Sequence, residues 1–156
     1  MQRTLKALSI RQPWATYSVR WRIGEVRSRR THYRGLLVIR AAQKDDQEFR
    51  ETLRNQDVSR GALIGIARLA NCRRVPSERA WRKLRRRLGE KGPRPYGTRT
   101  FVWFLEDRRE FVRPIPWKGR LGFFDVSYAI IRKAKCTAKL KTRHKSGSCR
   151  TFLLRP

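Results

Sequence analysis

The stretch SIRQPWATYSVRWRIGEVRSRRTHYRG, residues 9–35, decides the fold of this chain. Its first signal is the RQPWA of residues 11–15, where a β-like run stops. Pro13 suits the first position of a helix, because the backbone N–H that proline lacks would have no intrahelical partner there. We therefore expect a strand over residues 5–10 and a short helix over residues 13–19.

The second signal in this stretch is RIGEVR, residues 22–27. The chain becomes strand-like after Gly24, and side chains two apart on a strand share a face, so Glu25 and Arg27 point the same way. We expect one polar cleft here, lined by the end of the strand, the start of the helix and a carboxylate flanked by guanidiniums. The candidate catalytic residues are Arg22, Glu25 and Arg27.

Farther along the chain, short apolar runs alternate with two helical patterns. The expected strands cover residues 23–27, 36–42, 61–69 and 123–131, with a hairpin formed by 101–105 and 111–112; the expected helices cover 45–54 and 77–88. This pattern predicts one α+β domain over residues 1–131. After Asp125 the sequence contains no acid, so residues 132–156 read as a basic C-terminal extension.

Charge is the dominant compositional feature. The 156 residues include 40 Lys+Arg against 12 Asp+Glu, a formal net charge of +28. Such a field attracts polyanions, which makes nucleic acid the leading partner and an anionic membrane surface the second. Adaptation of a solvated surface is the alternative that requires no partner. No apolar run is long enough to span a membrane, and we expect a cytoplasmic protein.

The three cysteines are too few and too irregularly spaced to define a metal site. Cys136, His144 and Cys149 match no compact zinc signature, and an odd count of cysteines is typical of a cytosolic protein with reduced thiols. We expect no metal and no cofactor.

The order of the motifs resembles the ASCH domain family, which has a PUA-like fold. The resemblance covers residues 5–126: RQPWA, the RxxExR element, the YRG turn at 33–35, the run GALIGIA at 61–67, and WFLEDRREF with PIPWKGRLGFFDV between 103 and 126. The chain departs from the family pattern in having Arg22 where the family has lysine and Trp21 where it usually has glycine. The resemblance implies a small mixed β-barrel with peripheral helices, and RNA or a modified base as the ligand.

The residues agree with an RNA ligand. Arginine and lysine contact phosphate, and aromatic rings stack on unpaired bases. The candidate nucleic-acid-binding residues are Gln12, Trp14, Trp21, Tyr33, Arg34, Trp117 and Lys118, together with Arg82, Lys83, Arg85, Arg86 and Arg87 on the polar face of the helix over 77–88. Two structural alternatives stay open: Trp14 packing against the first helix, and Glu25 serving only to hold Arg22 and Arg27.

Two enzymatic alternatives follow from the resemblance. Some ASCH proteins act on N4-acetylated cytidine through a lysine, a threonine and a glutamate, but the lysine and threonine positions here are Arg22 and Glu25, and arginine does not give up its proton to act as a base. A ribonuclease would need a base, for which Glu25 or His32 is a candidate, and cations that stabilise the phosphorane, such as Arg22, Arg27 and Lys118.

The function that the sequence favours is RNA binding through a central polar cleft and a wide basic surface. The competing hypotheses are a ribonuclease that cleaves single-stranded RNA in the same cleft, without a metal or with weak metal assistance, and a basic protein associated with DNA.

Overall fold

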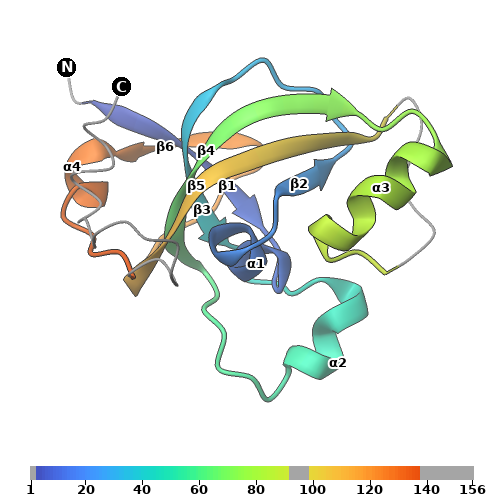
Figure 1. Cartoon of the computed structure of the whole chain (residues 1–156). Coiled ribbons are helices and arrows are strands. Elements are labelled where there is room, and N and C mark those ends of the chain that lie inside the picture. Colours follow the sequence, from blue (N-terminus) through green and yellow to red (C-terminus); the bar gives the residue numbers. More distant parts are fainter. Residues whose placement is uncertain (1–2, 92–98, 138–156) are drawn as a thin grey trace.

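A single six-stranded sheet forms the framework of the part of the chain that the computed structural model describes, residues 3–91 and 99–137. In spatial order its strands are β2 (Gly24–Arg27), β5 (Phe101–Pro116), β4 (Ala62–Arg74), β3 (Gly35–Ala41), β1 (Thr4–Ile10) and β6 (Phe123–Ser127). The β1–β3 pair is parallel and the other neighbouring pairs are antiparallel. The long strands β4 and β5 curve across the whole molecule (Figure 1).

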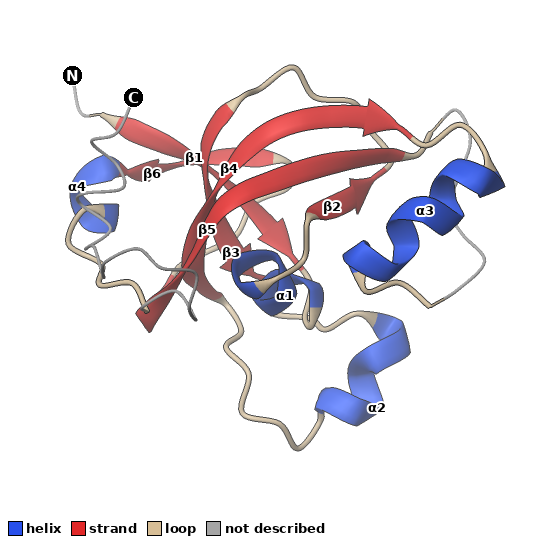
Figure 2. Cartoon of the chain, viewed as in Figure 1, coloured by secondary structure: helices blue, strands red, loops and turns tan. Residues whose placement is uncertain are grey.

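Within the described residues, four helices lie around this sheet rather than forming a layer of their own (Figure 2). They are α1 (Trp14–Arg20), α2 (Arg50–Leu53, after a 3-10 turn at Gln47–Phe49), α3 (Glu78–Leu88) and α4 (Tyr128–Ile131). The helix expected over 13–19 is confirmed as α1, whereas the helix expected over 45–54 is reduced to the short turn and α2.

The core occupies both faces of the sheet. Helix α1 buries Ala15 and Val19 against one face, among residues such as Ile39. The helix approaches closely because Gly65 has no side chain: a Cβ there would lie 2.7 Å from Cγ1 of Val19. The opposite face buries a second apolar cluster that includes Ile131 of α4.

The sheet curls but does not close, so the expectation of a barrel is wrong in this respect. Strands β2 and β6 are its two edges. The rings of Trp103 in β5 and Phe123 in β6 nevertheless stack with their centroids 5.3 Å apart, although three strands separate β5 from β6 in the sheet. Strong twisting of a mixed sheet brings these side chains together on the concave face without any ladder between the edges.

Two details of the expected strands are also wrong. Residues 106–109 do not turn the chain into a hairpin. They belong to the continuous strand β5, whose ladder with β4 shifts register at three places, and Asp107 adopts a φ of +48° there. The last strand ends at Ser127, where four residues that were expected to continue it form α4 instead.

Helix α3 begins as the sequence predicts, with the Ser77 hydroxyl accepting a hydrogen bond from the backbone N–H of Ala80. Its apolar residues Trp81 and Leu88 are fully buried against Val102 of β5. The helix is therefore fixed to the end of the sheet where β5 begins.

The extension from residue 132 starts alongside β5. The backbone N–H of Val112 donates to the carbonyl of Lys135 at 2.7 Å. Cys136 is disulfide-bonded, so the expectation of reduced thiols is wrong for this residue, whereas Cys72 is free and buried. The boundary at residue 131 stays a prediction, and the rest of the extension, residues 138–156, lies outside the described residues.

Two features are absent from the described residues. No helix there is long and apolar enough to cross a membrane. No group of three or more histidine, cysteine, aspartate or glutamate side chains is arranged to hold a metal ion in the same ranges.

Trp81 should be the main anchor of α3. We expect Trp81→Ala to lower the free energy of unfolding by about 3–5 kcal/mol, because it removes a fully buried ring and leaves a cavity. Chemical denaturation measures this, with Lys83→Ala on the exposed face of the same helix as control. A loss below about 1 kcal/mol would mean that α3 is not held through this ring.

Candidate nucleic-acid interface

Arg22 is the centre of a buried ionic cluster between α1, β2 and α3. Its Nη1 donates to Oε2 of Glu25 at 2.5 Å, its Nη2 to Oε1 of Glu90 at 2.6 Å, and its Nε to the carbonyl of Leu88 at 2.7 Å. The guanidinium carbon lies 4.3 Å from the centroid of the Trp14 ring. With 1% of its surface exposed, Arg22 joins α1 and β2, which flank it in the sequence, to the end of α3, where Leu88 is 66 residues away.

Local structure explains how Arg22 reaches this position. Helix α1 ends at Arg20, and the next backbone N–H groups, those of Trp21 and Arg22, both donate to the carbonyl of Tyr17. The Leu88 carbonyl that Arg22 contacts belongs to the last turn of α3, where carbonyls lack helical partners and a cation is favoured. The chain then leaves α3 through Gly89 in the left-handed region, and the ring of Trp21 covers that glycine.

Burial dominates the electrostatics of the two acids in this cluster. Burial raises the pKa of the Glu25 carboxyl above its ordinary value, while the guanidiniums of Arg22 and Arg27 oppose the rise. The pKa of the half-buried Glu90 is also raised, for the same main reason, and again Arg22 opposes it. A single cation therefore neutralises two acids that burial would otherwise tend to protonate.

The three candidate catalytic residues are brought together, but as an ion pair with little access. Nη1 of Arg27 lies 3.9 Å from Oε1 of Glu25, and its guanidinium carbon lies 5.5 Å from the ring centroid of Trp103. Glu25 is only 7% exposed. The arrangement holds β2 against its neighbours, and of the three side chains Arg27 is the one that reaches the surface.

The candidate stacking residues are dispersed. Trp14 is half-buried and packs edge-on against Phe49, at a centroid distance of 5.2 Å. Trp21 is 45% exposed at the end of α1. Tyr33 donates its hydroxyl to the carbonyl of Leu36, and Trp117 packs against the core on the far face of the sheet.

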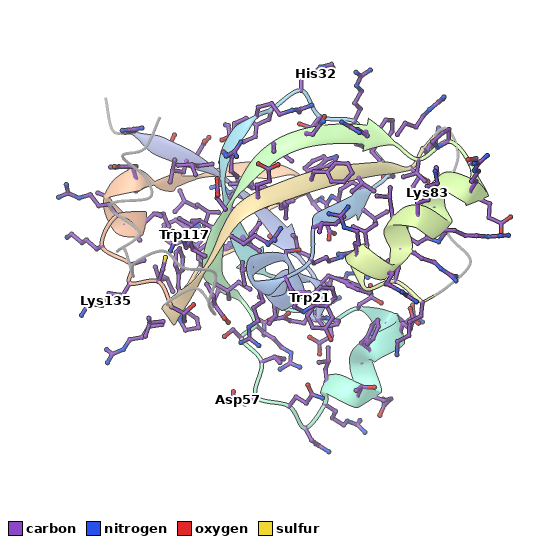
Figure 3. All side chains as sticks on the ribbon, viewed as in Figure 1. Trp21, His32, Asp57, Lys83, Trp117 and Lys135 are labelled. Atoms are coloured by element: carbon purple, nitrogen blue, oxygen red, sulfur yellow. The ribbon has the colours of Figure 1, made fainter. Side chains whose placement is uncertain are left out.

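Polar candidates outside the cluster fall into buried and exposed groups. Gln12 is completely buried, with its amide bonded to the Ser59 carbonyl and to Thr16, so we leave it out of any contact surface. Arg34 and Lys118 are exposed. His32, the alternative base, is exposed in the loop between β2 and β3 (Figure 3).

The cations of α3 form one solvent-facing surface. Arg82, Lys83, Arg85, Arg86 and Arg87 are all exposed, and Arg82 is partly neutralised by Glu78 at 2.6 Å. In Figure 3, Lys83 and Trp117 lie on opposite sides of the molecule. Strand β5 explains the separation, because α3 packs at its start and Trp117 follows its sixteenth residue. The predicted binding residues therefore belong to at least two separate regions.

Sequence reasoning missed a row of side chains on the concave face. Residues directly opposite across an antiparallel pair lie on the same face, and Phe101 of β5 is opposite both Arg27 of β2 and Arg74 of β4. Phe101 and Arg74, with Arg30 and Cys72, line a cavity of about 400 Å³. Phe101 at the start of one apolar run and Arg74 at the end of another were visible in the sequence, but the strand register was needed to place them side by side.

Comparison with known proteins identifies the fold. Two crystal structures of an ASCH protein from Zymomonas mobilis, one of a point mutant, superpose with TM-scores of 0.61 and 0.60. Each covers 83% of this chain, with 98% and 95% of their own chains covered and 16% and 15% sequence identity. The chain thus has an ASCH-like fold. No family model matches the sequence, and no curated protein matches it either.

Removing Arg22 should expose the dependence of the fold on this ionic cluster. We expect Arg22→Met to lower the free energy of unfolding at pH 7 by about 3 kcal/mol or more, since it leaves a buried carboxylate without its cation. The control is Arg20→Met, whose exposed pair with Glu110 is worth less than about 1 kcal/mol. Adding Glu25→Gln to Arg22→Met should recover part of the lost stability, because it removes the unpaired carboxylate. Equal losses in Arg22→Met and Arg20→Met would contradict the dependence of the fold on the ionic cluster.

The stability of Arg22→Met should also depend on pH. Without the cation, burial raises the pKa of Glu25 further above the value of 4.5 expected in the unfolded chain. Protonation then favours the folded state, so the deficit relative to wild type should be smallest below about pH 4.5 and grow as pH rises through the folded-state pKa. A deficit that stays constant between pH 4 and 8 would contradict this origin.

Proposed function

We propose that this protein binds RNA, with unpaired nucleotides contacting the concave face and phosphates contacting α3. The observation that supports the proposal most directly is the row formed by Arg27, Phe101 and Arg74, together with the adjoining cavity. A ring between two guanidiniums offers a stacking platform for a base and cations for the phosphates on either side of it.

The charge of the chain is consistent with a polyanionic ligand. With a net charge of +28 and few acids on α3, the molecule would release many counterions on binding RNA. Proteins with a PUA-like fold commonly bind RNA, which agrees with this choice of partner. The likeness to the Zymomonas mobilis structures supports the fold on which the proposal relies.

The buried state of Glu25 favours binding over cleavage. A general base must reach the proton that it removes, and Glu25 is 7% exposed and accepts a hydrogen bond from Arg22. We therefore place RNA binding first and treat ribonuclease activity, and a preference for duplex DNA, as outcomes that the experiment distinguishes.

The salt dependence of binding tests the electrostatic part of the proposal. Fluorescence anisotropy with labelled single-stranded RNA, duplex RNA and duplex DNA would be measured at several salt concentrations. If roughly six phosphates are neutralised, affinity should fall about a thousandfold from low to moderate salt. Lys83→Gln should reduce the slope by about one while weakening all sequences equally. A flat salt response would be incompatible with the proposal.

The aromatic part of the proposal predicts a different effect. Phe101→Ala should weaken binding of single-stranded RNA by about 1–3 kcal/mol with little change in the salt slope, since it removes a stacking surface and no charge. Val112→Ala, an exposed apolar residue toward the other end of β5, is the control. An equal loss of affinity in Phe101→Ala and Val112→Ala would reject the concave face as the RNA site. Tighter binding of duplex DNA than of RNA, unchanged in Phe101→Ala, would reject it as well.

The same samples, run on denaturing gels, test for cleavage. We expect intact RNA. RNA cut by the wild type and spared by Glu25→Gln would replace the binding proposal with a ribonuclease that uses Glu25.

A further inference from the structure

Arg40 is a second buried arginine, on the opposite face of the sheet from Arg22, and its surroundings differ. It is 8% exposed at the end of β3, on the same face as Val38 and Ser9. Its Nε donates to the Trp117 carbonyl at 2.8 Å, and its Nη1 lies 3.4 Å from the Ser9 hydroxyl. The loop between β5 and β6, residues 117–122, lies over it.

No acid neutralises Arg40 among the described residues. Arg22 bonds to two carboxylates, whereas no carboxylate oxygen in residues 3–91 and 99–137 lies within 4 Å of the Arg40 guanidinium. Asp45 is already held by Arg60 through two hydrogen bonds of 2.8 Å. Burial lowers the pKa of Arg40, and no acid offsets that effect. Desolvating a cation without a counter-charge costs several kcal/mol.

The guanidinium also has spare hydrogen-bond donors. Arginine carries five N–H donors, and the described part of the chain provides only two acceptors for Arg40. Through the edge that carries Nη1 and Nη2, a guanidinium can donate two parallel hydrogen bonds to two oxygens of one phosphate or carboxylate. Nη2 has no acceptor among the described residues, so this edge keeps donors that an external anion could use.

Two glycines lie close to this edge. A Cβ on Gly119 would lie 2.4 Å from Nη1 of Arg40, so the loop backbone can cover the guanidinium only because the side chain is absent. A Cβ on Gly61 would lie 3.9 Å from Nη2 and 2.4 Å from Oε1 of Gln43, so Gly61 lies between the guanidinium and the Gln43 side-chain oxygen. Lys118 and Arg120, both exposed, flank Gly119 and add positive charge.

We propose that the Nη1–Nη2 edge of Arg40, beneath the 117–122 loop, binds a phosphate group. The exposed cations Lys118 and Arg120 favour a phosphate over a singly charged carboxylate. This site is on the far side of the sheet from the Arg27, Phe101 and Arg74 row, and it does not depend on the proposed RNA function.

The first test is calorimetric titration of the full chain with inorganic phosphate at constant ionic strength. We expect one saturable site, whose affinity falls at least about tenfold in Arg40→Gln. Arg34→Gln is the matched control, because Arg34 is an exposed arginine that donates to two backbone carbonyls, and it should retain the site. Unchanged binding in Arg40→Gln, or an equal loss in Arg34→Gln, would overturn the proposal.

A second variant keeps every charge. Gly119→Ala should displace the guanidinium and weaken phosphate binding, so retention of full affinity would contradict the site. If either variant fails to fold, amide shifts in the wild-type NMR spectrum decide the matter. Phosphate should shift the amides of Ser9, Gly61 and Gly119, whereas shifts confined to α3 would overturn the proposal.

The source of the phosphate is distinguished by competition against inorganic phosphate. A short oligoribonucleotide with a 5′-phosphate that competes, when its 5′-hydroxyl counterpart does not, would assign the site to an RNA terminus. If neither oligoribonucleotide competes, the site would be assigned to free phosphate. Both results presuppose the Arg40-dependent binding measured above.

Discussion

The buried guanidinium of Arg22 is the interaction on which the arrangement of α1, β2 and α3 depends. Apolar packing buries α1 in one core cluster and α3 in another, so these clusters do not join the two helices to each other. Arg22 compensates by bonding to Glu25, Glu90 and the Leu88 carbonyl while stacking on Trp14. A buried ionic cluster of this kind contributes little net stability but strongly disfavours other arrangements, since each alternative leaves a charge unpaired.

The N-terminal motifs could be predicted from sequence because they are local. RQPWA and RxxExR each contain their own strand or helix signal, and the Arg22–Glu25 pair spans only three residues. Glu90 could not be predicted as a partner, since it is 68 residues away and reaches Arg22 because α3 packs against the sheet through Trp81. The Ser77 cap was recognisable for the same local reason.

The errors concern long-range geometry. Continuity of β5 through residues 106–109 depends on register shifts against β4, which absorb the polar sequence EDRR in a strand rather than a turn. Closure of the sheet could not be judged from strand patterns either, because the concave face is completed by Trp103 and Phe123 stacking rather than by backbone pairing. The concave row that includes Phe101 stayed hidden for the same reason.

The contrast between the two buried arginines shows how the same residue type serves two purposes in one fold. Arg22 has its charge and most of its donors satisfied within the chain, and its neighbours are therefore fixed. Arg40 has backbone and hydroxyl acceptors but no acid among the described residues, so its charge stays uncompensated beneath a glycine loop. Carboxylates are scarce in a chain with this excess of cations. Arg40, the buried arginine that no carboxylate of the described residues neutralises, is therefore the place where an external anion would add the most stability.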